Sequence, residues 1–231
     1  MRTSEIRQSV VNFGIARTAF DLALRAINRL VFFKLLRGVV IEKVDPRFLV
    51  CDERYRFSRL EEQTLRKFAA SQEYELSDGF LREAFARGDE CYGFLDGEVL
   101  AAYGWYTRRP TCLDKPELVL RFSDHYIYMY KGFTHPAHRG QRLHAIGMTK
   151  ALEIFLARGY RGFVSYVEAT NFSSLRSCYR MGYADFGTVA ILRLGARGLA
   201  HGSAGCRPYD FRVDWSLAGQ ASSLPSAGTV S

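Results

Sequence analysis

Residues 124–160 constrain the fold of this 231-residue chain more than any other segment. Residues 125–133 are rich in tyrosine and isoleucine, which favours a β-strand. Pro136 and Gly140 then interrupt regular structure, and apolar residues recur over 143–155 with the spacing of one helix face. The segment predicts a strand, a basic turn and a helix. The free N–H groups at the start of such a helix favour an anion.

Two motifs stand out, HPAHRGQRLH at residues 135–144 and NFSSLRSCYRMGY at residues 171–183. Together they resemble the GCN5-related N-acetyltransferases (GNAT). The first motif, in the turn, is similar to the acyl-CoA-binding signature of that family, an Arg-Gly pair followed by glycines at alternate positions. The second motif resembles the second conserved segment of the family. The later glycine positions of the turn are Arg142 and His144 here, so the chain departs from the family pattern at two phosphate-binding positions.

The resemblance implies a binding site for acetyl-CoA or another acyl-CoA as co-substrate. It places the phosphates on the backbone of the turn, at Arg139, Gly140, Gln141, Arg142, Leu143 and His144. It places Phe133 and Thr134 beside the pantetheine arm, which they contact through their backbone. Asn171 matches a family position that hydrogen-bonds this arm, and it is also a suitable N-cap for the helix that follows.

The resemblance also suggests catalytic residues. Tyr179 stands where many family members carry the acid that protonates the leaving thiolate, although its spacing equally suits a core aromatic. Glu168 ends a predicted strand and is the first candidate for the base that deprotonates the amine. Tyr128, Asp124 and His125 are alternatives for that base. Since no serine or cysteine has a convincing partner, we expect direct attack by a primary amine in a ternary complex.

The order of predicted elements, β-α-α-β-β-β-α-β-α-β-β, matches the GNAT fold. This is an α/β fold with a mixed, mostly antiparallel sheet, a central parallel crossover and helices on both faces. The resemblance covers roughly residues 55–195. Strands are expected within 38–50 and at 55–60, 91–95, 98–107, 125–133, 162–169, 188–194 and 209–213, helices at 61–71, 77–87, 143–158 and 171–180, and a loop at 108–120. Asp96-Gly97 between two apolar runs predicts a hairpin.

An amphipathic helix is expected over residues 4–36, ahead of the family segment. The predicted organisation is an N-terminal helix at 1–37, an acyltransferase domain at 38–215 and a disordered tail at 216–231. The helix is too polar to span a bilayer and lacks the apolar core of a secretory signal. Three roles stay open for it: packing on the domain or on a second copy, lying on an anionic membrane surface, or binding another protein.

The composition favours a protein of a reducing compartment, and we expect a cytoplasmic one. Five scattered cysteines form no C-x-x-C pair, and the three histidines near the turn have no acidic companion, so no metal site is expected. The net charge of +8 suits a phosphate-bearing partner or an anionic membrane. Two alternative functions remain: a catalytically degenerate adaptor of the same fold, and a nucleic-acid-binding protein, which residues 130–134 faintly suggest.

Overall fold

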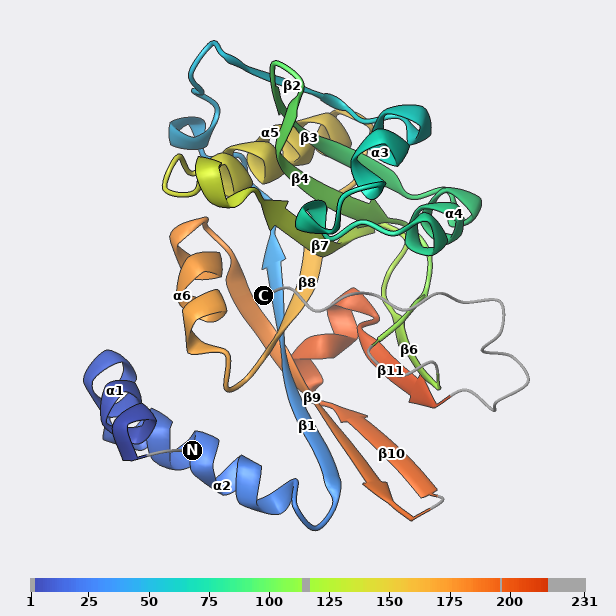
Figure 1. Ribbon diagram of the computed structural model, residues 1–231. Coiled ribbons are helices and arrows are strands. Elements are labelled where there is room, and N and C mark those ends of the chain that lie inside the picture. The colour runs from blue at the N-terminus through green and yellow to red at the C-terminus, as the bar shows by residue number, and fades with distance from the viewer. Residues whose placement is uncertain (1–2, 114–116, 196, 216–231) are drawn as a thin grey trace.

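The computed structural model describes residues 3–113, 117–195 and 197–215 (Figure 1). Its strands are β1 (Phe32–Ile41), β2 (Tyr55–Arg59), β3 (Glu90–Asp96), β4 (Val99–Thr107), β5 (Thr111–Cys112), β6 (Leu118–Arg121), β7 (Tyr126–Thr134), β8 (Gly162–Glu168), β9 (Ala184–Leu194), β10 (Arg197–Gly202) and β11 (Arg212–Trp215). Eight of them form one sheet in the order β10-β9-β1-β8-β7-β4-β3-β2, and a smaller sheet has the order β11-β6-β5. Within the described residues β7 and β8 are the one parallel pair, which confirms the predicted mixed sheet with a central parallel crossover.

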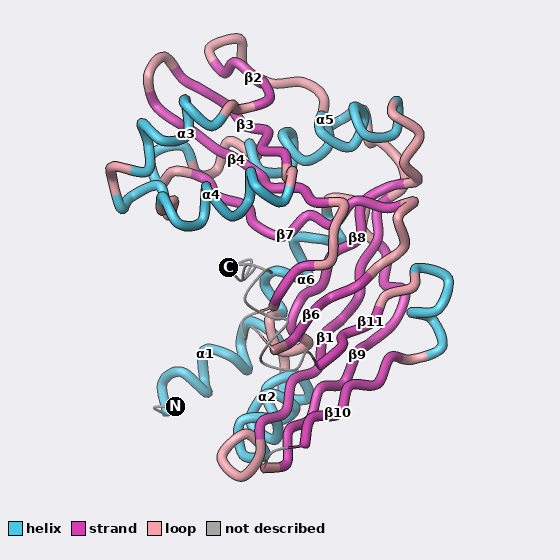
Figure 2. The backbone as a smooth tube through the Cα atoms, turned by 90° about the vertical axis from the view of Figure 1, so that its right-hand side faces the viewer, coloured by secondary structure: helices cyan, strands magenta, loops and turns pink. Residues whose placement is uncertain are grey.

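Helices cover both faces of the large sheet, as predicted. They are α1 (Thr3–Phe13), α2 (Ile15–Ile27), α3 (Glu62–Ala69), α4 (Asp78–Arg87), α5 (Leu143–Ala157) and α6 (Phe172–Arg180). Leu65 of α3 and Leu81 of α4 enter one core cluster, whereas Leu152 of α5 and Leu175 of α6 enter another. Figures 1 and 2 show α1 and α2 at the opposite end of the molecule from α3, α4 and α5. None of the helices in the described ranges is both long and apolar enough to cross a membrane.

The N-terminal segment is helical as predicted, but it is not one continuous helix and it does not extend to residue 36. Gly14, with φ 88° and ψ 165°, separates α1 from α2, and the apolar run from Phe32 onward is the strand β1. β1 lies between β8 and β9 and is antiparallel to both, so that Leu36 faces Glu168 on one side and Val189 on the other. Pairing on both edges overrides the helical spacing of the apolar residues. The expected domain boundary at residue 37 therefore falls inside β1.

The segment expected as a loop at 108–120 contains two strands, β5 and β6, and residues 114–116 between them are not described. β10 was not expected, and β11 begins at Arg212 rather than at Tyr209, which ends a 3₁₀ turn. The predicted tail at 216–231 lies outside the described residues. These differences occur outside the crossover unit that holds the site.

β7, α5 and β8 form that crossover unit. β7 pairs with β8 only from Tyr126 to Tyr128, opposite Gly162 to Val164. On its other edge β7 continues to pair with β4 as far as Thr134. The two parallel strands thus separate, and the backbone of residues 130–134 has a ladder partner on one edge alone within the described sheet. A half-paired strand edge can receive the amide groups of an extended ligand.

Candidate active site

The turn before α5 presents a row of unpaired backbone N–H groups. Gly140 has φ 80° and Arg142, the N-cap of α5, has φ 58° and ψ 19°, so two left-handed residues shape the turn. The Arg142 side chain makes no capping hydrogen bond. Among the described residues, none accepts a hydrogen bond from the six successive N–H groups of residues 140–145. Unpaired N–H groups together with the positive end of a helix dipole make an anion-binding concavity.

A groove of about 500 Å³ opens beside this turn. Its walls come from the end of β7, the start of α5 and one side of α6. The lining residues are Glu75, Gly132, Phe133, Thr134, Arg139, His144, Ser173, Ser174, Ser177, Cys178 and Met181. The groove thus joins the half-paired edge of β7 to the unpaired N–H groups.

The turn residues predicted from the sequence contribute in different ways. The side chains of Arg139 and His144 line the groove, whereas those of Gln141 and Arg142 are exposed. Leu143 is 1% exposed and packs in the core, so its backbone alone faces the turn. Basic side chains and free backbone donors together suit a multiply charged phosphate group.

His144 is the side chain that closes the groove against β7. A Cβ atom built on Gly132 would lie 2.5 Å from the Cε1 atom of His144 and 2.8 Å from its Nδ1 atom, so the ring occupies the space that a side chain would need there. Burial lowers the pKa of His144, which favours the neutral imidazole. Its ring makes no hydrogen bond to any described residue and can therefore donate to or accept from a ligand.

The two sides of α6 face different cavities. Ser174, Ser177 and Cys178 line the groove, and burial raises the pKa of the Cys178 thiol to about 11. Tyr179 instead lines a second cavity with Leu175 on the other side of the helix. The structure therefore brings Phe133, Thr134, Arg139 and His144 together at the groove but directs Tyr179 away from it.

Tyr179 is 41% exposed and held by a polar cluster. Its hydroxyl donates to the Asp185 carboxylate, with distances of 2.9 Å to both oxygens, and accepts from Arg37 Nη1 at 3.2 Å. Arg37 also donates to Asp185 at 2.7 Å. Burial, reinforced by the hydrogen bond to Asp185, raises the pKa of Tyr179. Action of this hydroxyl on a ligand in the groove requires that it leave Asp185.

The carboxylate of Glu168 is held at the end of β8. Its Oε1 atom lies 2.7 Å from Lys34 Nζ on the neighbouring strand β1, and Glu168 does not line the groove. Asp124 and His125 precede the start of β7, whereas the groove lies at its end. Tyr128 is 1% exposed in the core. None of the four candidates for the base thus has its side chain in the groove wall.

Two further residues lie at or next to the groove: Glu75 lines it, whereas Asn171 is not a lining residue and precedes Ser173 and Ser174, which are. Asn171 is the N-cap of α6, where its Oδ1 atom accepts from the Ser174 N–H at 3.1 Å and from the Ser173 hydroxyl at 3.0 Å. This capping interaction was predicted from the sequence. Glu75 was not predicted to be part of the site, yet it lines the groove with φ 53°, a left-handed conformation that is uncommon outside glycine. Glu75 lies sixty residues before His135, the first residue of the turn, so no local sequence pattern linked it to the site.

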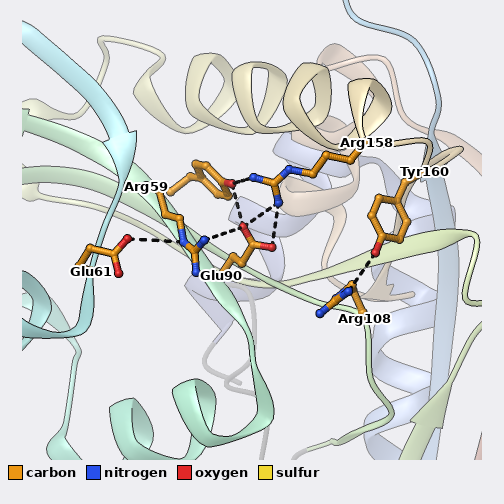
Figure 3. A network of polar contacts seen from close by, with 7 residues as sticks. Arg59, Glu61, Glu90, Arg108, Arg158 and Tyr160 are labelled. Carbon is orange, nitrogen blue, oxygen red and sulfur yellow. Dashed lines mark hydrogen bonds and ion pairs between the residues drawn. The ribbon is translucent and has the colours of Figure 1, made fainter.

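The far end of α5 is fixed by a polar network (Figure 3). Arg158 Nη1 donates to both oxygens of Glu90 at 2.9 Å, and Arg158 Nη2 donates to the Tyr92 hydroxyl at 2.7 Å. Tyr92 donates to Glu90 at 2.8 Å, and Arg59 lies 3.8 Å from the same carboxylate. This network ties the C-terminal end of α5 to β3 and thereby orients the helix whose other end faces the groove.

The sequence profile described as the acetyltransferase (GNAT) family matches residues 54–183. The matched segment spans more than half of the chain and contains the hairpin, the crossover unit and α6. The chain therefore belongs to the GNAT acetyltransferase family. No curated protein sequence matches this chain significantly.

Several solved structures are similar to this chain. A GNAT-family acetyltransferase from Novosphingobium aromaticivorans is 17% identical with a TM-score of 0.49, over 81% of this chain and 67% of its own. A GNAT-family acetyltransferase from Colwellia psychrerythraea is 13% identical with a TM-score of 0.48, over 73% of this chain and 60% of its own. An aminoglycoside acetyltransferase from an uncultured soil metagenomic sample is 11% identical with a TM-score of 0.43, over 57% of this chain and 89% of its own.

GNAT proteins generally use acetyl-CoA or another acyl-CoA. The groove has groups suited to both parts of acyl-CoA. The unpaired N–H groups and Arg139 suit its phosphates, and the half-paired edge of β7 suits the amide groups of its pantetheine arm. Within the described ranges no three residues among His, Cys, Asp and Glu are grouped so as to hold a metal ion.

Proposed function

We propose that this chain transfers an acyl group, most simply acetyl, from acyl-CoA to a primary amine by direct attack in a ternary complex. The observation that carries the proposal is the row of six unpaired N–H groups over residues 140–145, at the mouth of a groove of about 500 Å³. A pyrophosphate bound there would be neutralised by backbone donors and Arg139. The backbone cradle explains how Arg142 can replace a glycine, because its left-handed φ keeps the shape of the turn.

The pantetheine arm would extend along β7. Beyond Tyr128 the strand loses its partner β8, and the backbone of Phe133 and Thr134 becomes available to the amides of the arm. Asn171, which caps α6 on the opposite wall, keeps its amide nitrogen free to donate to the same arm. The thioester would then lie where β7 and β8 separate.

The leaving thiolate needs a proton when the C–S bond breaks. We assign this proton to Cys178, which lines the groove and whose raised pKa keeps it protonated at neutral pH. Tyr179, the acid expected from the family resemblance, is the competing candidate, and its hydroxyl must first break its hydrogen bond to Asp185. Water returns a proton to the Cys178 thiolate after turnover.

The attacking amine must lose a proton, directly or through water. Glu75 is the carboxylate in the groove wall, held in an uncommon left-handed conformation. Glu168, the base expected from the sequence, is paired with Lys34 outside the groove. The proposal therefore gives the base role to Glu75 and retains Glu168 as the alternative.

The test begins with binding. Acetyl-CoA at a hundred times its dissociation constant should stabilise the protein by about 2.7 kcal/mol in thermal unfolding. A panel of primary amines is then screened by release of free CoA thiol, with acetyl-CoA and a long-chain acyl-CoA as donors. Absence of stabilisation by every acyl-CoA would refute the proposal and favour the adaptor or the nucleic-acid-binding alternative.

Matched variants of the two candidate acids on α6 and of the two candidate carboxylate bases determine which residue acts as general acid and which as general base. Cys178→Ala and Glu75→Gln should each lower kcat by roughly 100-fold, the usual contribution of a general acid or base. Cys178→Ser should restore part of the loss, because serine retains a donor. Tyr179→Phe and Glu168→Gln should stay within about twofold of the wild type. The reverse pattern would establish Tyr179 and Glu168, the residues predicted from the sequence, as acid and base.

A further inference from the structure

A second cavity of about 490 Å³ lies on the side of α6 that faces away from the groove. Its walls come mainly from α2, β1 and α6, with Thr188 of β9, so α2 and β1, which precede the family segment, build part of it. Its apolar wall consists of Ala16, Phe20, Leu35, Ala169, Phe172 and Leu175. The volume lies within the range of small-molecule sites. Of the residues proposed for the transfer reaction, only the alternative acid Tyr179 lines this cavity.

Three arginines line the cavity, and their charge is not balanced. Arg37 is paired with Asp185 at 2.7 Å. Arg17 and Arg176 have no carboxylate partner among the described residues. Arg176 donates through Nη2 to the Asn12 carbonyl at 3.0 Å, which leaves its other N–H groups available. Two guanidinium groups that have no carboxylate partner among the described residues, beside an apolar wall, favour a ligand with one anionic end.

Aromatic rings hold these two arginines in place. The guanidinium of Arg17 lies 5.6 Å from the ring centroid of Phe172, and that of Arg176 lies 5.5 Å from the ring centroid of Phe13. The two rings are themselves 5.4 Å apart. Stacking on aromatic rings orients a guanidinium without neutralising it, so the N–H groups are prearranged for a ligand.

We propose that this cavity binds an amphipathic anion, a carboxylate or phosphate attached to an apolar chain, with the anionic end on Arg17 and Arg176 and the apolar part against Phe20, Phe172 and Leu175. Such a molecule can come from a lipid surface or be free in solution. The exposed apolar residues Val11, Ile15 and Leu30, at 73%, 76% and 87% exposure, lie on or next to the same N-terminal helices and are compatible with a lipid source. The site is independent of acyl-CoA binding.

The probe is octyl phosphate below its micellar concentration, titrated by calorimetry into the full-length protein. We expect one bound molecule, with affinity at least tenfold higher than for octyl glucoside or inorganic phosphate, because each of these lacks one of the two recognised parts. Arg17→Gln and Arg176→Gln should each weaken binding about tenfold, the usual loss for one charge-assisted contact. Arg180→Gln is the matched control, since Arg180 is an exposed arginine of α6 outside the cavity.

The pattern of variants decides the proposal. Equal binding of octyl phosphate by the wild type, Arg17→Gln and Arg176→Gln would overturn it, as would no binding at all. Cosedimentation with phosphatidylglycerol vesicles separates the sources. Vesicle binding that octyl phosphate abolishes and both variants lose identifies a lipid ligand, whereas octyl phosphate binding without vesicle binding identifies a free amphiphile. Acetyl-CoA stabilisation is measured in parallel and should be unchanged in all three variants.

Discussion

The two ends of α5 are built in opposite ways. At its C-terminal end Arg158, just beyond the helix, is bonded to Glu90 and Tyr92. At its N-terminal end the N-cap Arg142 provides no capping side chain, and the N–H groups of residues 140–145 have no acceptor in the described part of the protein. We call the C-terminal end closed, because side chains bind it, and the N-terminal end open, because its N–H groups have no acceptor among the described residues and face the groove.

The difference separates stability from binding within one helix. An uncapped helix start forgoes about 1 kcal/mol of stability that a serine or aspartate would supply. The same open donors become useful when an anion occupies them. The network at the other end holds the helix in register on β3 while its N-terminal end remains available. Changes at the N-terminal end should therefore act mainly on ligand binding, and changes at the C-terminal end mainly on the free energy of unfolding.

The largest expected effect comes from filling the groove at the open end. Gly132→Leu would place a side chain where the His144 ring now lies, 2.5 Å from its Cε1 atom, and would displace the ring into the groove. We expect acetyl-CoA to lose the stabilisation of about 2.7 kcal/mol that it gives the wild type at a hundred times its dissociation constant. Thermal unfolding with and without acetyl-CoA measures this.

The control for that substitution is Gly79→Leu. Gly79 lies in the first turn of α4, and the nearest atom to a Cβ built there is the Ser77 hydroxyl at 4.0 Å. This variant should keep the full response to acetyl-CoA. An unchanged response in Gly132→Leu, with a folded unliganded protein, would place the acyl-CoA site elsewhere.

Glu90→Gln is expected to remove the ion pair between Glu90 and Arg158 at the closed end of α5. The glutamine keeps the shape of Glu90, whose side chain is 13% exposed, but leaves the Arg158 guanidinium without its charged partner. We expect the free energy of unfolding to fall by about 1–2 kcal/mol, because one half-buried charged hydrogen-bond pair is lost. Urea unfolding measures the change, and Glu98→Gln, at an exposed position of the β3–β4 turn, should change nothing. A weaker acetyl-CoA response in Glu90→Gln would contradict the separation of the two ends.

The same carboxylate should make the closed end sensitive to acid. Burial opposes ionisation of Glu90, but the hydrogen bonds from Arg158 and Tyr92 outweigh it and lower the pKa of Glu90. A group whose pKa is lower in the folded state stabilises the protein above its unfolded pKa and loses this contribution as pH falls through the folded pKa. The difference in unfolding free energy between wild type and Glu90→Gln should thus be constant near neutral pH and shrink below about pH 4.3, the ordinary pKa of glutamate. A difference in unfolding free energy between the two proteins that grows as the pH falls would contradict this prediction.

Much of the fold could be predicted because its signals are local. Asp96-Gly97 marked the β3–β4 hairpin, and the glycine and proline of the turn marked the boundary between β7 and α5. β1 could not be predicted in full, because its conformation depends on β8 and β9, which lie more than a hundred residues away in the sequence. The mostly apolar residues 32–36 were therefore assigned to the end of the N-terminal helix, whereas in the structure they begin the central strand β1.

The residues of the candidate site also fall into those that local patterns predict and those that depend on tertiary packing. The turn was recognised from its motif, and Asn171 from the capping preference of its residue type. Ser174, Ser177 and Cys178 lie on one side of α6 at helical spacing, and in the structure this side lines the groove. Which side of α6 faces the groove depends on how the helix packs beside β7, and no local pattern gives that. The sequence therefore offered Tyr179 as the acid, and Cys178 becomes a candidate only once the structure shows that it lines the groove.

The smallest expected effect tests how the open end binds phosphate. Arg142 has φ 58°, a left-handed conformation that costs a non-glycine residue about 1–2 kcal/mol. Glycine would remove that strain and lose about 0.5–1 kcal/mol through greater freedom of the unfolded chain. Arg142→Gly should thus stabilise the unliganded protein by less than about 1 kcal/mol, measured by urea unfolding.

Gln141→Gly is the matched control, since Gln141 is the neighbouring turn residue and does not have a positive φ. It should destabilise the protein slightly, because the added chain freedom is not offset by relief of strain. If backbone N–H groups hold the phosphates, Arg142→Gly should weaken acetyl-CoA binding less than about tenfold, the loss expected for one charged contact. A larger loss, removed by high salt, would show that the guanidinium does the binding and that the turn geometry serves mainly to present it.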